Sequence, residues 1–367
     1  MKHTAEEMLR EALAAWSWPA TVTEAARYGN GHINDTFLGT TEEGALYIIQ
    51  RINTDIFTDP DGLMNNIKLV TDHIRNKVAS RGGDTSREVM TIVPTLDGKL
   101  YYTDINGSAW RVYDFVTDSL SLDRPRNTDD SYLAIKAFGE FASSLADFDA
   151  SLLVESIKDF HNTPKRYSAL INAITANVYG RAEKVGDEIK FAQAHESFTR
   201  KLVTSGLPLR VTHNDTKLSN VLLDDETGEA VCVIDLDTVM PGTVLYDFGD
   251  AIRFGASTAA EDEPDTSKIA LDMDLFKAFT RGFISEVKGS LTETELRMLP
   301  LGIKVITCEL AMRFLTDYID GDLYFKVRSP EHNLIRARAQ MKLAADMQNK
   351  FDDMNRIVAQ VAAQVRK

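Results

Sequence analysis

Cysteine is scarce in this chain. Cys232 and Cys308 are the two cysteines among 367 residues, and two cysteines cannot form the disulfide framework that stabilises small secreted domains. Both lie in apolar stretches, so we interpret them as small buried hydrophobic residues. The cysteine content therefore predicts a protein of a reducing compartment, the cytoplasm.

Long apolar runs are also absent. No segment approaches the roughly 18 uncharged apolar residues that a membrane-spanning helix needs. The first residues, MKHTAEEMLREALAAWSW, place acidic side chains where a signal peptide needs an unbroken apolar stretch. We therefore expect a soluble chain without a membrane partner.

Positive charge is in deficit. The sequence has 41 lysines and arginines against 55 aspartates and glutamates, a net charge of −14. Because such a surface repels a phosphate backbone, the composition argues against a nucleic-acid partner. Any phosphorylated ligand would have to be met by a local positive patch or by a metal ion.

The secondary-structure pattern changes near residue 116. Strand and turn signals dominate 22–115, interrupted by a helix over 60–78 that Asp59 caps. The rest is mainly helical, with a polar, mobile loop expected over 256–269 and one long last helix opening at Ser329-Pro330. This pattern predicts an α+β chain with a small β-rich lobe over 1–116 and a larger helical lobe over 117–367.

Two apolar β-type runs near the middle of the chain predict a hairpin. They cover 221–223 and 230–234, and the turn sequence DDETGE joins them. Pairing the runs would bring Asn220, before the first strand, beside Asp235, after the second. An amide oxygen and a carboxylate are hard ligands that suit Mg²⁺. We therefore predict a magnesium site formed by Asn220 and Asp235.

Two further acids in this region have different predicted roles. Asp215 lies five residues before Asn220, where a carboxylate could accept a proton or orient a hydroxyl near the metal. Asp247 belongs to a literal DFG tripeptide, which in protein kinases carries a metal-binding aspartate. Here it follows a Pro-Gly turn at what looks like a helix start. We interpret Asp247 as a structural anchor that accepts backbone hydrogen bonds.

These motifs resemble a known family. The ordered set HND, Asn220, IDLD and LYDFGD resembles the aminoglycoside phosphotransferase family of small-molecule kinases, relatives of the protein kinases. The chain is more specifically similar to the N-acetylhexosamine 1-kinases. That similarity lies in the following blocks: YGNGHINDTF, WRVYDF, FHNTPKR, LRVTHNDTKLSNVLLD, IDLDTVMPGTVLYDFGDAIRFGAS, MRFLTDYIDGDLYF and PEHNLIRARAQMKL.

The resemblance implies a protein-kinase-like two-lobed fold with a nucleotide-binding N-terminal lobe and a catalytic, sugar-binding C-terminal lobe. It implies phosphorylation of the anomeric hydroxyl of N-acetylglucosamine or N-acetylgalactosamine by ATP and Mg²⁺, a step of carbohydrate metabolism. Asp215 would be the catalytic base, and Asn220 and Asp235 the metal ligands. The positions that would face the sugar are His32, Asp215, Phe254, Arg313 and Tyr324.

The nucleotide would bind the N-terminal lobe. The adenine would dock on the interlobe segment Tyr113, Asp114, Phe115 and Val116. Gly29 and Gly31 would let the backbone approach phosphate, although either could equally be a turn glycine. Gln50 or Arg51 stands near the place of the lysine that grips the phosphates in protein kinases, and the helix over 60–78 lacks the glutamate that pairs with it. Whether Gln50 or Arg51 reaches the phosphates stays open.

Three other classes of protein compete with this interpretation. A protein kinase needs a long activation segment after its metal aspartate, and here LYDFGD begins ten positions after Asp235. A non-catalytic nucleotide-binding scaffold would be expected to lose the acids that are present here. Choline, homoserine and methylthioribose kinases remain compatible with the superfamily motifs.

Overall fold

The chain divides into two compact units. The computed structural model describes residues 5–29, 33–123 and 125–365. The first unit, here called the β unit, comprises Met1–Leu120, Ser151–Lys158 and Leu222–Met240. The second, the helical unit, comprises Ser121–Ala150, Asp159–Val221 and Pro241–Lys367.

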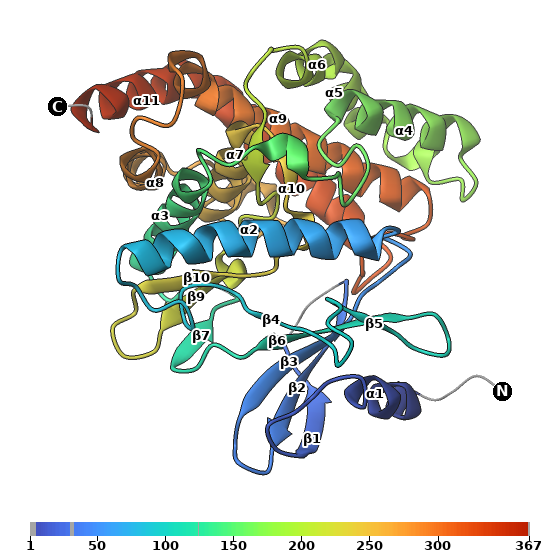
Figure 1. Ribbon diagram of the computed structural model, residues 1–367. Helices are drawn as coiled ribbons and strands as arrows, with labels where there is room; N and C mark the ends of the chain where they lie inside the picture. The colour runs from blue at the N-terminus through green and yellow to red at the C-terminus, as the bar shows by residue number, and fades with distance from the viewer. Residues whose placement is uncertain (1–4, 30–32, 124, 366–367) are drawn as a thin grey trace. The chain divides into compact units, whose positions relative to one another are not determined.

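An antiparallel sheet forms the centre of the β unit (Figure 1). Its strand order is β1-β2-β3-β6-β4, and β5 also pairs with β6. The strands are β1 (Val22–Arg27), β2 (Asp35–Thr41), β3 (Leu46–Arg51), β4 (Ile92–Val93), β5 (Tyr102–Thr103) and β6 (Ala109–Asp114). All residues of β6 except the last are buried. Each strand pairs with its neighbour in antiparallel orientation, as the turn-rich sequence predicts.

Two helices accompany this sheet. Helix α1 (Ala5–Leu13) buries Leu9 and Ala12 in a cluster with Trp110 of β6. Helix α2 (Pro60–Ser80) begins as predicted, because the Asp59 side chain accepts the backbone N–H of Gly62 and proline occupies the first turn.

The predicted hairpin is present in the β unit. Strands β9 (Val221–Asp224) and β10 (Ala230–Val233) pair with each other, and β7 (Ser119–Ser121) adds to β9. Gly228 takes a positive φ of 73° in the connecting turn, which glycine adopts without the clash of a Cβ. The hairpin prediction is therefore confirmed.

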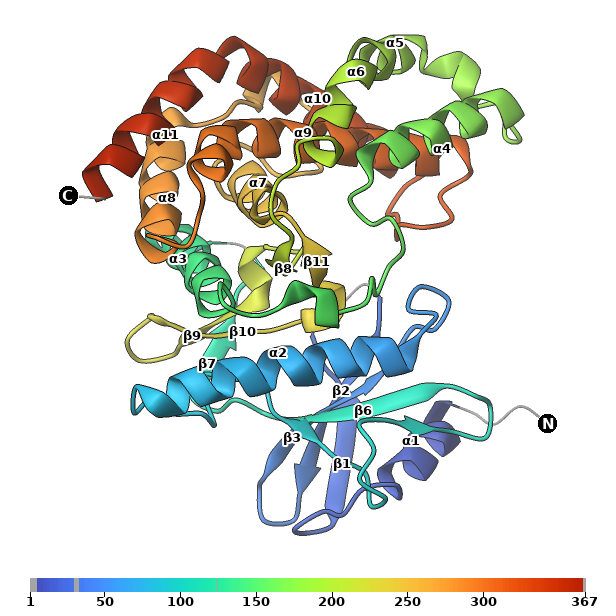
Figure 2. The same ribbon diagram turned by 45° about the horizontal axis from the view of Figure 1, so that its top comes forward.

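The helical unit is built around the longest helix. Helix α9 packs against α4, α6, α7, α10 and α11 (Figure 2). The helices are α3 (Thr128–Ser144), α4 (Thr163–Ala176), α5 (Gly186–Ala194), α6 (Glu196–Val203), α7 (Val244–Gly255), α8 (Met273–Glu286), α9 (Glu293–Ile319), α10 (His332–Asn349) and α11 (Phe351–Val365). A short two-stranded sheet pairs β8 (Arg210–Thr212) with β11 (Met240–Gly242). The 3-10 turns are η1 (Ala150–Leu152), η2 (Ala182–Lys184), η3 (Leu218–Asn220), η4 (Leu236–Thr238) and η5 (Thr266–Lys268).

Two glycines allow α7 and α9 to pack closely. A Cβ on Gly249 would lie 2.9 Å from the carbonyl oxygen of Gly302, and a Cβ on Gly302 would lie 2.6 Å from that of Leu245. Neither position can hold a side chain without a shift of backbone. The glycine of the DFG tripeptide is therefore a packing residue between two helices.

One sequence prediction for this unit was wrong. The expected single last helix is two helices, which meet at Lys350, and the Lys350 Nζ bonds the Leu271 carbonyl and the Asp346 carboxylate.

The loop expected over 256–269 has no α-helix. Its Thr258 hydroxyl donates to the carbonyls of Lys268 and Ala270. The expected mobility of this loop stays a prediction.

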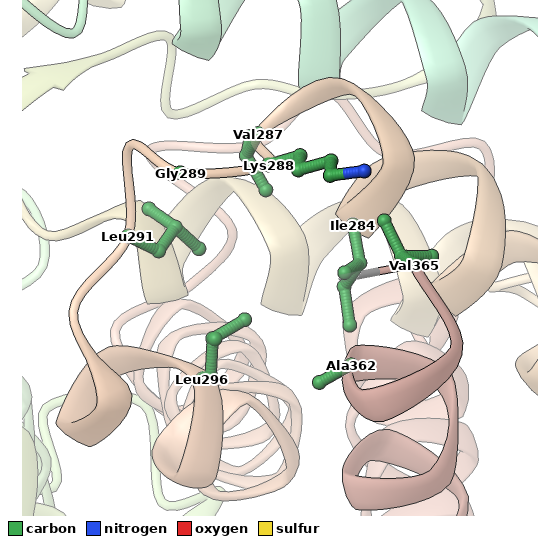
Figure 3. A pocket seen from close by; sticks show the side chains of 8 residues that line it. All are labelled: Ile284, Val287, Lys288, Gly289, Leu291, Leu296, Ala362 and Val365. Atoms are coloured by element: carbon green, nitrogen blue, oxygen red, sulfur yellow. The ribbon is translucent and has the colours of Figure 1, made fainter. Parts of the chain in front are cut away.

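No helix in the described ranges is both long and apolar enough to cross a membrane. The helical unit contains a small hollow, which Figure 3 shows. Its lining is Ile284, Val287, Lys288, Gly289, Leu291, Leu296, Ala362 and Val365. This lining contains no acid and is unsuited to phosphoryl transfer.

Candidate active site

The segment after β8 is held by the acids of the DFGD sequence. The Asp247 carboxylate accepts the backbone N–H groups of His213 at 2.9 Å and Asn214 at 2.7 Å. Asp250 accepts the N–H of Thr216 at 3.1 Å. Burial raises the pKa of the Asp247 carboxyl, while the His213 charge and the two N–H groups oppose the rise. The prediction of a structural anchor at Asp247 is confirmed.

Aromatic rings hold the histidine of the HND motif. His213 is fully buried, and its ring lies edge-on to Phe138 at 5.3 Å and to Phe141 at 5.7 Å, both from α3. With Asp247 bonding its backbone and α3 packing its ring, the chain is fixed immediately before Asp215.

Asp215 lies among polar partners. One third of its side chain is exposed, and Lys217 Nζ lies 2.7 Å from its Oδ2. Asn220 Nδ2 donates to its backbone oxygen at 2.8 Å and to its Oδ2 at 3.0 Å. Burial by itself raises the pKa of the Asp215 carboxyl. The charges of Lys217 and His213 and the hydrogen bond from Asn220 outweigh burial, so the pKa lies below its ordinary value. Asp215 is therefore ionised near neutral pH and able to accept a proton.

Asp215 and Asn220 are brought together, as the sequence suggested. Because the Asn220 amide nitrogen is engaged by Asp215, the amide oxygen is the atom through which Asn220 can bind a cation. The sequence analysis missed Lys217. In HNDTKLSN this lysine follows Asp215 by two positions, a spacing that indicates a possible ion pair.

Asp235 follows β10 in the β unit. Its backbone is left-handed, with φ 60° and ψ 57°, a conformation that aspartate tolerates better than most residues. The turn after it is fixed by Asp237, whose backbone oxygen accepts the Ser156 hydroxyl at 2.7 Å. A carboxyl side chain on this turn has the chemistry of a Mg²⁺ ligand. Its assignment to the metal stays a prediction.

A buried arginine neutralises Asp237. Arg111 is 1% exposed, and its Nη1 lies 2.6 Å from Asp237 Oδ1. Its Nε and Nη2 donate to Gln50 Oε1 at 3.0 and 2.8 Å. Gln50 also donates to Thr36. The Gln50 side chain is thus bonded within the β unit, and its assignment to the nucleotide stays a prediction.

The neighbouring Arg51 forms a cross-strand ion pair with Asp35. The sequence analysis overlooked Arg111, although an arginine inside the apolar strand AWRVYDF indicates a buried acidic partner. The fully buried charge of this sheet is Arg111, and its partner is Asp237 of η4.

One ring contact connects the regions of two predicted nucleotide residues, Gly29 and Phe115. Gly29 has a φ of 72°, and no atom of the other described residues lies within 4 Å of the place that a Cβ would take there. The preceding Tyr28 ring contacts Phe115, with centroids 6.0 Å apart. Gly31 and His32 lie outside the described residues.

The predicted adenine segment covers the last two residues of β6 and the two residues after it. Tyr113 and Val116 are buried, and Asp114 and Phe115 donate their backbone N–H groups to Thr91 and Leu46. Burial raises the pKa of the Asp114 carboxyl, against the charge of Arg75. The adenine assignment of these four residues stays a prediction.

Two predicted sugar residues meet in the helical unit. The Arg313 guanidinium lies 5.7 Å from the Tyr324 ring centroid and 4.9 Å from that of Phe160. Tyr324 is 47% exposed, so its ring can reach a ligand. Phe254 lies half-buried near the end of α7. The sugar-contact roles stay predictions, and Phe160 was not among them.

The acids of DYIDGD do not form a solvated turn, which corrects the sequence-based expectation. Asp317 is buried and accepts the N–H groups of Tyr324 at 2.7 Å and Phe325 at 2.9 Å. Asp322 pairs with Arg181 at 2.5 Å. The backbone N–H groups of the segment that carries Tyr324 need hydrogen-bond partners, and the buried Asp317 carboxylate provides them.

The sequence model of the phosphotransferase enzyme family matches residues 24–272. The chain belongs to this family. The match includes Asp215, Asn220 and Asp235, while Arg313 and Tyr324 lie beyond it. By family, the chain is a phosphotransferase.

Solved structures of small-molecule kinases share the fold. A microcompartment-associated aminopropanol kinase is 18% identical with a TM-score of 0.64, covering 95% of this chain and 98% of its own. Amicoumacin kinase, solved with AMP-PNP and Ca²⁺, is 14% identical with a TM-score of 0.60 and 93% coverage of both chains. A choline kinase from Streptococcus pneumoniae is 11% identical with a TM-score of 0.55, covering 93% of this chain and 98% of its own.

These similarities confirm the predicted fold class. The phosphotransferase combines an N-terminal antiparallel sheet with a mainly helical C-terminal part, the protein-kinase-like arrangement.

Proposed function

We propose that this phosphotransferase phosphorylates the anomeric hydroxyl of N-acetylglucosamine or N-acetylgalactosamine. The observation that carries the proposal is the fixed Asp215, ionised by Lys217 and held by Asn220. Phosphoryl transfer requires positioning and one acid that orients the nucleophile. An anomeric hydroxyl is more acidic than an ordinary alcohol, so a carboxylate is a sufficient base.

In the proposed step, Asp215 accepts the proton of the anomeric hydroxyl. A bond forms between the anomeric oxygen and the γ-phosphorus of ATP. The bond from that phosphorus to the β,γ-bridging oxygen breaks, and ADP leaves with the electron pair. Lys217 keeps Asp215 ionised before the transfer.

The residues proposed for the magnesium ion are Asn220 and Asp235. An amide oxygen and a carboxylate are the kind of ligands that Mg²⁺ takes from proteins, with waters and phosphates completing its shell. When bound, the ion would neutralise charge on the transferred phosphoryl group.

The charges near Arg313 are close to balanced. Burial and the charge of Arg313 lower the pKa of Arg166, and the carboxylates of Glu309 and Asp317 lie on the same helix as Arg313. The support for a sugar acceptor in this cluster is therefore aromatic, because the rings of Phe160 and Tyr324 suit the apolar face of a sugar.

The acceptor can be tested by a panel of candidate substrates. Purified protein with ATP and Mg²⁺ would be assayed on N-acetylglucosamine, N-acetylgalactosamine, glucose, homoserine, choline and aminopropanol. Phosphorus NMR would then locate the phosphate. We expect a sugar 1-phosphate. Exclusive phosphorylation of choline or aminopropanol would refute the proposed acceptor.

A further inference from the structure

One face of α9 carries three charged residues spaced by four. Glu309, Arg313 and Asp317 follow one another at i, i+4 and i+8, so they lie along one side of the helix. Glu309 and Asp317 are buried. A row of charges inside a mainly apolar helix indicates that each has a specific partner.

Glu309 holds a histidine. Its Oε1 lies 2.8 Å from His161 Nδ1, and its Oε2 accepts the Thr163 hydroxyl at 2.6 Å. Burial by itself raises the pKa of the Glu309 carboxyl. The contacts with His161 and the charge of Arg313 outweigh burial, so the pKa lies below its ordinary value. An ionised carboxylate accepts hydrogen bonds only, so the proton on Nδ1 faces Glu309.

The other ring nitrogen of His161 is buried and unbonded. Nδ1 and Nε2 lie on opposite edges of the imidazole, so Nε2 faces away from Glu309. Nε2 lacks a hydrogen bond to any residue that the structure describes. The His161 side chain is 7% exposed. A buried polar atom without a partner is costly, and such atoms often mark binding or catalytic positions.

The ring of His161 is fixed beside the predicted acceptor residues. It lies between Phe160, at 4.6 Å, and Tyr246, at 4.7 Å. The same Phe160 ring contacts the Arg313 guanidinium at 4.9 Å, and Arg313 contacts Tyr324 at 5.7 Å. His161 is therefore joined through the Phe160 ring to Arg313, and through Arg313 to Tyr324.

We propose that His161 is a specificity-determining residue of the acceptor site, binding a hydroxyl of a neutral polyhydroxylated acceptor through Nε2. A hydroxyl both donates and accepts, so it suits either protonation state of the imidazole. Glu309 is the positioning residue, because it sets the ring orientation through Nδ1. The inference rests on the proposed function, since it requires an acceptor bound in the helical unit.

Two substitutions separate the two edges of the ring. His161→Asn places an amide near Nδ1 and keeps the Glu309 contact, but it removes the group at Nε2. His161→Gln places an amide near Nε2 and gives up the Glu309 contact. If His161 binds the acceptor, His161→Asn raises the KM for the acceptor about tenfold or more, and His161→Gln raises it less. The KM for ATP stays within about twofold for both.

His195 provides a matched control. Its Nδ1 bonds the Phe191 carbonyl at 2.8 Å and its ring stacks on Phe191 at 4.1 Å, in the same unit but outside the acceptor cluster. His195→Asn should leave both KM values unchanged. Thermal unfolding of each variant, and the same kinetics on Glu309→Gln, cover the case in which one His161 variant fails to fold. Glu309→Gln should raise the acceptor KM without changing that for ATP.

The outcomes distinguish this inference from the proposed function. If the wild type phosphorylates a sugar but His161→Asn keeps the wild-type acceptor KM, the inference about His161 fails alone. It fails equally if KM rises in parallel for ATP and acceptor, or if His161→Gln is the more impaired variant. If the wild type phosphorylates no neutral hydroxylated acceptor, both proposals fall.

Discussion

The Asp247 carboxylate bonds the backbone N–H groups of both His213 and Asn214, 2.9 and 2.7 Å away. The aspartate of the DFG tripeptide is thus the support of the loop that carries Asp215. The same three letters that provide a metal ligand in protein kinases here provide a backbone acceptor.

Replacing Asp247 therefore should affect the fold more than the metal. In Asp247→Asn the charge is lost and one acceptor oxygen remains for two N–H groups. We expect a loss of about 1–3 kcal/mol in the free energy of unfolding, measured by denaturant titration, with little change in the magnesium concentration for half-maximal activity. A raised magnesium requirement at unchanged stability would instead assign Asp247 to the metal.

Asp215→Asn should retain ATP binding and lose turnover. The amide cannot take the proton of the acceptor, so kcat should fall by about 10²–10⁴. Asp225→Asn is the control, because Asp225 is exposed in the hairpin turn. Steady-state kinetics and nucleotide binding by calorimetry check both variants. Near-normal kcat in Asp215→Asn would remove this residue from the proposed mechanism.

Asp235, the proposed metal ligand in the β unit, should affect the magnesium requirement. Asp235→Asn should raise the magnesium concentration needed for half-maximal activity by about tenfold or more, because a neutral amide binds Mg²⁺ less strongly. Magnesium titrations of the wild type and the variant test this. An unchanged requirement would mean that Asp235 does not ligate the ion.

Gly249→Ala should destabilise the helical unit. Its added Cβ would meet the Gly302 carbonyl at 2.9 Å, and overpacking of this kind costs about 1–3 kcal/mol. Gly186→Ala is the matched control, since nothing lies within 4 Å of a Cβ there. That change should be neutral or stabilising by up to about 1 kcal/mol. Equal unfolding free energies for the two variants would contradict the packing role.

The ion pair of Glu295 with Arg210 predicts an acid-dependent stability. Burial by itself raises the pKa of the Glu295 carboxyl. The hydrogen bonds from Arg210 and Thr292 outweigh burial, so the pKa lies below its ordinary value. Because the folded pKa lies below the unfolded value, the pair stabilises above the unfolded pKa, about 4.3. This stabilisation is lost as pH falls through the folded pKa.

Glu295→Gln should consequently cost about 1–3 kcal/mol at pH 7. Its difference from the wild type should shrink in unfolding experiments as pH falls below the unfolded pKa of about 4.3. Thr294→Ala, on the same helical turn, serves as the control. A difference independent of pH would show that packing, and not the charge, is responsible.

Local patterns predicted much of this molecule. The hairpin of β9 and β10, the Asp59 cap and the anchoring by Asp247 follow from turn residues, capping chemistry and short-range spacing. The break at Lys350 was missed because the apolar spacing continues across it, and the Leu271 carbonyl that Lys350 bonds lies 79 residues away.

The missed parts of the candidate site have the same origin. Arg111 and Asp237 are separated by 126 residues, and His161 and Glu309 by 148. A buried charge becomes interpretable only when its partner is known, and periodicity gives no partner. Asp317 and Asp322 looked like surface acids because their sequence is that of a turn, although buried backbone and arginine groups neutralise them.

Helix α9 has a consequence for how this protein can change during evolution. Gly302 allows the approach of the helix that bears the DFGD acids, while Glu309, Arg313 and Asp317 face the histidine and aromatic cluster. Adding or deleting one residue between Gly302 and Glu309 would rotate the second group by about 100° relative to the first. Insertions there would decouple the two halves of the helical unit, so relatives should vary in side chains along this stretch while keeping its length.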